Sequence, residues 1–250
     1  MGKITSLITG SGVIGAYLSK ELIKRNHNVI VTSRYLKKNY KNYKYLKIHK
    51  KVKFIKLNIL NKNNIKKILE KYLPTNVFYF SGQSSITKSF KLRKSTFESN
   101  YLGVKNFLDI INKINIKIKF FKANSGYIFL PKKGEISIKS KISKSLNPYI
   151  QSQIKAYKLV KKFRKKGLKC YNIIFLQVES PLRDNDFFVK KVCIHAKSKR
   201  IITVGNINTV RDYSWAPEIV KGVYCLSKIN PCDIILSSGK GISGKDIIDF

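Results

Sequence analysis

Acidic residues are scarce in this 250-residue chain. Only 13 aspartates and glutamates stand against 51 lysines and arginines, which gives a formal net charge of +38. Cysteine is scarce too, and the few cysteines neither show CxxC spacing nor cluster with the histidines; they are Cys170, Cys193, Cys225 and Cys232. This pattern argues against a disulfide framework and against a zinc site.

Long apolar runs are also missing. No hydrophobic stretch, including CYNIIFLQV, approaches the roughly 20 residues that a membrane-spanning helix needs, and the N-terminus enters a strand pattern without a signal peptide. With 43% hydrophobic residues, the chain can nevertheless bury a full core. We therefore expect a globular protein with no membrane segment and a cytoplasmic location.

The excess positive charge could bind nucleic acid, an acidic membrane surface or an anionic small ligand. Lysine, asparagine and isoleucine are abundant along the whole chain, which favours general residue usage over a localised patch. In the densest stretch, residues 34–53, lysines alternate with Tyr35, Tyr40, Tyr43 and Tyr45. Such interleaving is typical of a surface that stacks nucleic-acid bases, but it also fits a solvated loop and strand edge.

Strand and helix patterns alternate along the chain with short connections. Strands are predicted at residues 3–9, 28–33, 52–59, 76–81, 117–124 and 169–177, and helices at residues 13–25, 61–72, 97–114 and from 148 onward. This alternation predicts an α/β, Rossmann-like fold, in which helices cover both faces of a doubly wound parallel sheet. We expect a Rossmann domain at 1–176 and a smaller lobe at 177–250 that is interleaved with the last Rossmann elements.

The first predicted strand runs directly into TGSGVIGAYL, a G-x-G-x-x-G pattern. Gly10, Gly12 and Gly15 permit a tight turn, and the backbone N–H groups of Val13 and Ile14 open a helix N-terminus that can bind a pyrophosphate. A glycine-rich turn without a ligand is the alternative. Because the motif lies between a predicted strand and a predicted helix, it favours dinucleotide binding.

The end of the second predicted strand bears on the identity of the dinucleotide. An acid at this position would bind the ribose hydroxyls of NAD, but the sequence offers Thr32, Ser33 and Arg34. A cation beside small hydroxyl residues favours a 2′-phosphate, so we expect NADP. The alternative is that Arg34 belongs only to the basic loop.

The segment NPYIQSQIKAYK, residues 147–158, opens like a catalytic helix. Asn147 suits the N-cap and Pro148 the first helical position. Tyr149 and Gln153 lie one turn apart and therefore share a helix face.

Several segments, in one order, resemble the extended short-chain dehydrogenase/reductases that act on nucleotide sugars, the NAD-dependent epimerase/dehydratase family, and most closely the GDP-mannose 4,6-dehydratases. The similar segments are FYFSGQSSITKSF, NYLGVKNFLDII, FFKANSGYIF, FLQVESPLRDNDFFVKK and VGNINTVRDYSWAPEIVKGVY. The resemblance covers nearly the whole chain. It implies NADP as cofactor, a nucleotide sugar such as GDP-mannose as substrate, and commonly a homo-oligomer.

The resemblance also implies roles for individual residues. The implied catalytic positions are Tyr149, Ser125, Gln153 and Tyr127. The implied cofactor-binding residues are Gly10, Gly12, Val13, Ile14, Gly15, Arg34, Asn58, Ile59, Ser81 and Gln83. The implied substrate-binding residues are Glu179, Lys190 and Arg211, and the resemblance identifies Asn100 as a structural asparagine.

The departures from the family fall where its chemistry would occur. In the family the tyrosine removes the proton of the sugar 4-hydroxyl while hydride passes to NADP, and a lysine one turn later lowers the pKa of that tyrosine. Gln153 cannot supply this charge, and a free tyrosine with a pKa near 10 is ionised in only about one molecule in a thousand at neutral pH. Tyr127 replaces the acid that takes the C5 proton, and Asn58 replaces an aspartate that holds the adenine. Because the chain stops at Phe250, we also expect a small, truncated C-terminal substrate lobe.

Three interpretations of the function remain open. An NADP-dependent nucleotide-sugar enzyme of altered activity accounts for the segment order and for Tyr149 and Ser125. A non-catalytic relative, which binds nucleotide or pairs with an active homologue, accounts better for Gln153 and Tyr127. A basic nucleic-acid-binding protein on the same fold is supported only by the charge.

The expectation of NADP can be tested at Arg34. The protein should bind NADP more tightly than NAD by at least about tenfold, since hydrogen bonds between charged groups contribute about 1.5–3 kcal/mol. The Arg34→Asp variant should lose this preference in calorimetric titrations with both dinucleotides. Equal affinities in the unmodified protein would contradict the assignment.

Overall fold

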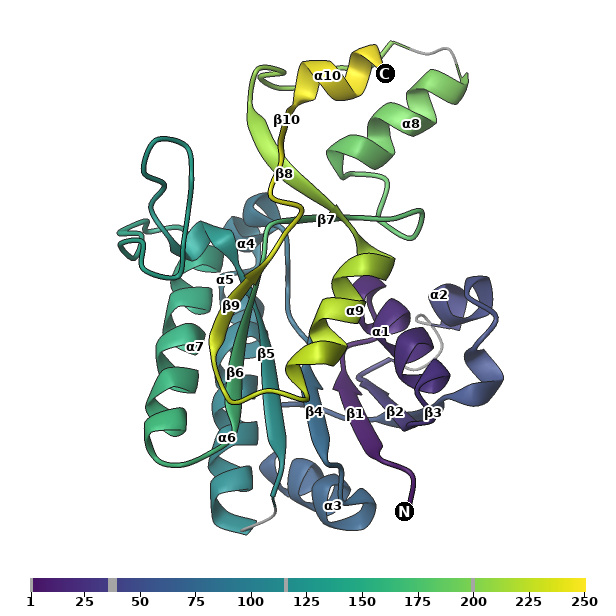
Figure 1. The fold of residues 1–250 in the computed structure, drawn as a ribbon, viewed down its shortest axis with the longest axis vertical. Helices are drawn as coiled ribbons and strands as arrows, with labels where there is room; N and C mark the ends of the chain where they lie inside the picture. Colours follow the sequence, from purple (N-terminus) through teal and green to yellow (C-terminus); the bar gives the residue numbers. More distant parts are fainter. Residues whose placement is uncertain (1, 36–39, 115–116, 199–200) are drawn as a thin grey trace.

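The computed structural model describes residues 2–35, 40–114, 117–198 and 201–250. Its centre is a seven-stranded parallel sheet with the order β3-β2-β1-β4-β5-β6-β9 (Figure 1). These strands are β1 (Thr5–Thr9), β2 (Asn28–Ser33), β3 (Lys53–Lys56), β4 (Asn76–Tyr79), β5 (Lys119–Ser125), β6 (Cys170–Phe175) and β9 (Asp233–Leu236). The strand order reverses between β1 and β4, which is the point where Rossmann folds bind their ligands.

Helices cover both faces of this sheet (Figure 1). The long helices on these faces are α1 (Val13–Lys24), α3 (Lys62–Tyr72), α6 (Gly103–Ile114), α7 (Pro148–Lys165) and α9 (Ala216–Leu226), while α8 (Phe188–Ser198) lies beyond the carboxyl end of the sheet. The short ones are α2 (Tyr40–Tyr45), α4 (Ile86–Lys91), α5 (Arg93–Phe97), α10 (Gly244–Asp249), the 3₁₀ turns His49–Lys51 and Gly126–Ile128, and a π-helical turn, Glu98–Leu102. Among the described residues, no helix combines the length and the apolar character needed to cross a membrane.

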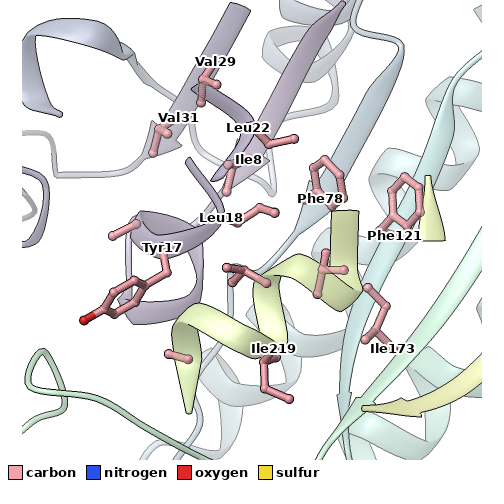
Figure 2. Close-up of a cluster of buried hydrophobic side chains, with 14 of the residues drawn as sticks. Ile8, Tyr17, Leu18, Leu22, Val29, Val31, Phe78, Phe121, Ile173 and Ile219 are labelled. Atoms are coloured by element: carbon pink, nitrogen blue, oxygen red, sulfur yellow. The ribbon is translucent and has the colours of Figure 1, made fainter. Parts of the chain in front are cut away.

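Successive strand residues alternate between two buried clusters, as the period of two of a β-strand requires. Ile8, Phe78 and Phe121 pack on one face against α1 and α9, and Figure 2 shows Leu18, Leu22 and Ile219 closing over them. The neighbouring residues Leu7, Val77 and Phe120 pack on the other face against α3, α6 and α7. The Rossmann-like, doubly wound fold expected from the sequence is therefore confirmed.

The register of the central strands aligns three aromatic rings across the sheet. Phe121 pairs with Phe78 on one side and with Tyr171 on the other. The ring centroids lie 4.6 Å and 4.3 Å apart, respectively, with nearly parallel planes. Stacking of this kind adds to the hydrophobic burial that holds β4, β5 and β6 together.

One predicted helix differs from the expectation. The segment 97–114 consists of the end of α5, the π-helical turn Glu98–Leu102 and α6. Such π-helical turns are rare and often occur near functional sites. This one carries Asn100, a buried side chain that reaches the loop after β4.

A second, three-stranded sheet lies beyond the carboxyl end of the central sheet (Figure 1). It contains β7 (Gln177–Glu179), β8 (Val210–Trp215) and β10 (Gly241–Ser243), in the order β10-β8-β7. Between β8 and β10 the chain returns to the central layers as α9 and β9. The part after residue 177 thus contributes to both sheets.

The tyrosines of the basic segment 34–53 have different environments. Tyr43 is fully buried, and the Tyr40 ring lies 4.4 Å from the Phe54 ring. Tyr35 and Tyr45 are exposed, and residues 36–39 of this segment lie outside the described residues. Part of the segment therefore belongs to the core, while its binding of nucleic acid stays a prediction.

Asp233 joins the last strand of the central sheet to its neighbours. Its carboxylate accepts hydrogen bonds from Arg164 Nη2 at 2.6 Å, Asn172 Nδ2 at 2.9 Å and the Tyr157 hydroxyl at 2.9 Å. Burial alone would raise the pKa of Asp233, but the hydrogen bonds from Asn172 and Arg164 outweigh it and hold the pKa below its ordinary value. This carboxylate therefore ties β9 to α7 and β6 in its ionised form.

The Asp233→Ala variant should lose about 3–5 kcal/mol of unfolding free energy in urea at pH 7, because a buried ion pair that loses one partner leaves an uncompensated charge. The control is Asp186→Ala, which removes the exposed partner of Lys88 and should cost less than about 1 kcal/mol. Because the folded pKa of Asp233 is lowered, its contribution is present above the unfolded pKa of about 3.9 and declines as the pH falls below it. The gap between the unmodified protein and Asp233→Ala should accordingly narrow in acid.

Candidate functional site

A cavity of about 420 Å³ lies at the carboxyl ends of β1, β4, β5 and β6. It brings together many residues that the sequence singled out from separate segments: Gly12, Val13, Ile14, Gly15, Ser81, Gln83, Ser125, Tyr127, Tyr149 and Gln153. The roles implied for these residues remain predictions, but one space contains the glycine turn and the start of α7.

The glycine turn packs its backbone tightly on one side and leaves the other side open. Gly10 has a φ of +87°, and a Cβ at this residue would lie 2.7 Å from the carbonyl oxygen of Phe80. A Cβ on Gly15 would lie 2.4 Å from the carbonyl oxygen of Gly10. A Cβ on Gly12 would meet nothing within 4 Å. Packing therefore requires glycine at residues 10 and 15. At residue 12 a side chain would have room, because it would point into open space.

The N-terminus of α1 has no side-chain cap, because its N-cap residue is Gly12. The first backbone N–H groups of the helix, beginning at Val13, lie at the cavity lining. Uncapped N–H groups and the positive end of the helix dipole favour an anionic group. The residues present therefore fit the pyrophosphate of a dinucleotide.

Asn100 holds the loop that follows β4. Its Oδ1 accepts a hydrogen bond from the Gln83 backbone N–H at 3.1 Å, and its Nδ2 donates to the Gln83 carbonyl at 3.2 Å and to Ser152 Oγ at 3.1 Å. A Cβ on Gly82 would lie 2.3 Å from Asn100 Oδ1. Asn100 thus fixes Ser81 and Gln83 relative to α7.

The start of α7 follows the expected capping pattern. Asn147 Oδ1 accepts hydrogen bonds from the backbone N–H groups of Tyr149 at 2.9 Å and Ile150 at 3.2 Å. The Tyr149 side chain is buried beside Ser125. Burial raises the pKa of Tyr149, while its hydrogen bond with Ser125 and the Arg183 guanidinium act in the opposite direction without cancelling the rise. Tyr149 alone is therefore a protonated phenol at neutral pH.

Lys122 is a cavity residue that the sequence did not indicate. It lies on β5 with 2% of its surface exposed, and its Nζ donates to Gln153 Oε1 at 3.1 Å and to the Ala123 carbonyl. Burial lowers the pKa of Lys122 to about 7. A lysine inside the apolar strand KFFKANS was the available signal, but the abundance of lysine in the chain concealed it.

Arg183 is a second cavity cation that the sequence did not indicate. Its guanidinium lies 3.5 Å from the centroid of the Phe187 ring, and its Nε lies 3.8 Å from Glu179 Oε2. Burial lowers the pKa of Arg183 and raises that of Glu179. Glu179 is not part of the cavity lining, so its contact with the site runs through Arg183.

Tyr127 is held at the position implied for an acid. Its hydroxyl accepts hydrogen bonds from Arg211 Nη1 and from Gln177 Nε2, the latter at 3.3 Å. The Arg211 guanidinium also lies 5.6 Å from the centroid of the Tyr127 ring. Arg211 does not line the cavity, and it reaches the site only through Tyr127.

Other residues singled out by the sequence make local contacts away from the cavity lining. Asn58 Oδ1 accepts a hydrogen bond from the Leu60 N–H at 3.0 Å, and Ile59 is buried against Gly103. Lys190 Nζ donates to the Pro181 carbonyl at 3.1 Å. Arg34 is exposed, with its guanidinium 5.8 Å from the Tyr35 ring centroid. Helix α2 contributes two residues to the cavity lining, Lys41 and Asn42.

Within the described ranges, no group of three or more histidine, cysteine, aspartate or glutamate side chains could hold a metal ion. The charged lining residues of the cavity in these ranges are Lys41, Lys122, Arg183 and Asp184. The site is therefore rich in cations and hydroxyl groups.

The chain is similar to enzymes that act on nucleotide sugars. The sequence profile of the GDP-mannose 4,6 dehydratase family matches residues 7–250. The chain is 24% identical over 271 residues to GDP-mannose 4,6-dehydratase of Vibrio cholerae, covering 100% of this chain and 71% of that protein. It is 26% identical over 196 residues to GDP-mannose 4,6 dehydratase 2 of Caenorhabditis elegans, covering 74% of this chain and 50% of that protein. The chain thus spans only part of the length of these relatives.

Solved structures share the fold. This chain and UDP-glucose 4-epimerase from Thermus thermophilus, in its complex with NAD, superpose with a TM-score of 0.87 at 20% identity. The match covers 98% of this chain and 81% of that chain. The NAD complex of dTDP-glucose 4,6-dehydratase from Bacillus anthracis has a TM-score of 0.86 at 15% identity and covers 98% of this chain and 79% of that chain. At these identities the similarity shows the fold alone.

The different surroundings of Gly12 and Gly15 should separate folding from binding. The Gly12→Ala variant should unfold in urea like the unmodified protein, because its Cβ enters open space, and it should bind NADP at least about tenfold more weakly because a methyl group then occupies the anion site. The Gly15→Ala variant should lose about 1–3 kcal/mol of stability through overpacking. Equal stability losses in the two variants would contradict this account of the turn.

Proposed function

The chain belongs to the GDP-mannose 4,6-dehydratase family, and we propose that it is an NADP-dependent enzyme that oxidises a nucleotide sugar of the GDP-mannose type at C4. The observation that carries the proposal is one cavity lined by the uncapped start of α1, Ser125 and Tyr149. A dinucleotide site and a hydroxyl pair in the same space suit transfer of a hydride and a proton from one alcohol.

In this proposal the chain binds the dinucleotide through the first N–H groups of α1 and the loop fixed by Asn100. NAD(P)-dependent chemistry is supported by the family. Arg34 and Lys41 are the cations that we assign to the 2′-phosphate of NADP, since Lys41 lines the cavity and Arg34 directly follows β2. When bound, the nicotinamide supplies the hydride acceptor for C4.

Tyr149 accepts the proton of the sugar 4-hydroxyl in this proposal, and Ser125 orients that hydroxyl. The depth of the site favours this assignment because Tyr149 and Ser125 are both buried, which excludes bulk water from the reacting hydroxyl. The raised pKa of Tyr149 makes a nearby cation necessary for the proton transfer, since a positive charge stabilises the phenolate.

The outcome after C4 oxidation depends on residue 127. Membership of the family favours a 4,6-dehydratase, which removes water from the sugar and forms a 4-keto-6-deoxy product. Tyr127 favours a second candidate, in which hydride returns to C4 without loss of water, as in a 4-epimerase. A phenol that already accepts hydrogen bonds from Arg211 and Gln177 is a weaker base for the C5 proton than a carboxylate.

The test combines calorimetry with product analysis. GDP-mannose should bind saturably in the presence of NADP, with a UDP-sugar as the comparison. Mass spectrometry then distinguishes a dehydrated product from an isomer of unchanged mass. The Tyr149→Phe variant should retain binding and lose at least about 100-fold in turnover, because general-base catalysis typically contributes that much. Saturable binding without turnover in the unmodified protein would support the non-catalytic interpretation, and no binding of any nucleotide sugar would overturn the proposal.

A further inference from the structure

Lys122 is a buried cation without a carboxylate partner among the described residues. No salt bridge within these ranges includes it, and its hydrogen bonds go to the side-chain oxygen of Gln153 and to the Ala123 carbonyl. A third neighbour is the Tyr79 ring, whose centroid lies 6.0 Å from Nζ. Burying an ammonium group is costly unless it is compensated, so this arrangement requires an explanation.

The contact with Lys122 fixes the orientation of the Gln153 amide. An ammonium group has three donors and no acceptor, so only the amide oxygen can face it. The two Nε2 hydrogens of Gln153 therefore point away from Lys122. No residue in the described ranges accepts a hydrogen bond from them, and Gln153 lines the cavity. The pair thus leaves a polarised amide donor available to a ligand.

We propose that Lys122 and Gln153 act together as the positively charged donor of the site, with the charge on β5 and the hydrogen-bond donor on α7. This inference rests on the proposed function. Lys122 supplies the charge that Gln153 lacks, and Gln153 presents N–H donors to the ribose hydroxyls of the dinucleotide and to the surroundings of Tyr149. Lys122 acts through Gln153 and through its electric field, so it is a positioning and charge-supplying residue.

The charge on Lys122 is coupled to the occupancy of the cavity. Its pKa of about 7 means that the amine is only partly protonated at neutral pH before a ligand binds. An anionic dinucleotide favours the protonated form and should raise this pKa. The other titratable groups that line the same cavity are Lys41, Tyr79, Tyr127, Tyr149, Arg183 and Asp184. Of these, only Asp184 carries a carboxyl group, so an anionic ligand would be the main new partner of Lys122.

The first experiment exchanges the two residues. The Lys122→Met variant should reduce kcat on the nucleotide sugar by at least about tenfold, because a unit charge near the phenolate is lost. Gln153→Lys should also be impaired, since it brings two ammonium groups together in a buried space. The double variant Lys122→Gln, Gln153→Lys should recover activity, because it again contains one cation and one amide. Activity in the double variant no higher than in the worse single variant would overturn the inference.

The second experiment measures protons and needs no turnover. Calorimetric binding of NAD, which lacks a titrating 2′-phosphate, is repeated in buffers of different ionisation enthalpy at pH 6 and pH 8. Lys122 is already protonated at pH 6 and largely neutral at pH 8, so proton uptake should be near zero at pH 6 and approach one at pH 8. The Lys122→Met variant should take up none at either pH.

Lys119→Met is the matched control, because Lys119 lies on the same strand and donates to the Ser227 carbonyl at a distance from the cavity lining. It should keep both the proton uptake and the kcat of the unmodified protein. Dinucleotide binding with equal proton uptake in the unmodified protein and in Lys122→Met would overturn the inference and leave the proposed function intact. Failure of the unmodified protein to bind either NAD or NADP would overturn the proposed function itself.

Discussion

The common direction of the seven central strands is the constraint on which the rest of the structure depends. Parallel strands with helical crossovers place all carboxyl ends at one edge of the sheet, so the residues that follow β1, β4, β5 and β6 must meet there. The close contact of Gly10 with Phe80 shows how tightly two of these ends approach. Ser125 ends a third strand beside them. The cavity is therefore a consequence of strand direction, and its chemistry is set by which side chains follow each strand.

The distribution of charge gives this cavity its character. Most of the lysines and arginines that the structure describes are solvated, where a charge costs little and is screened. Lys122 is different because it is buried, and Arg183 because only 17% of its side chain is exposed. Burial depresses the pKa of each. Arg183 has Glu179 and the Phe187 ring as neighbours, whereas Lys122 has only dipoles and a ring. An interior with this excess of positive charge is suited to an anionic ligand such as a dinucleotide or a nucleotide sugar.

Gln153 and Tyr127, the two positions at which the sequence departs from the proposed catalytic set, differ in what surrounds them. Gln153 touches a lysine from another element, so the loss of charge in the helix sequence is offset in space. At Tyr127, by contrast, no described carboxylate takes the place of the missing acid. The hydroxyl group of Tyr127 accepts hydrogen bonds from Arg211 and Gln177. Under the proposed function, these surroundings favour proton and hydride transfer at C4 over the removal of a proton from C5. A substitution in a catalytic motif has to be interpreted together with the side chains that pack against it.

The sequence by itself determined the order of strands and helices, the glycine turn and the capped start of α7, because each of these depends on periodicity or on residues close together in the chain. The predicted strand 28–33 and the capping by Asn147 illustrate this. Only the tertiary structure decided that Lys122 meets Gln153, that Arg211 reaches Tyr127, and that Asp233 ties β9 to α7. These contacts form across the packing of separate elements, and no local pattern specifies them. In a chain so rich in lysine, nothing but burial distinguishes the one at position 122 from those that water surrounds.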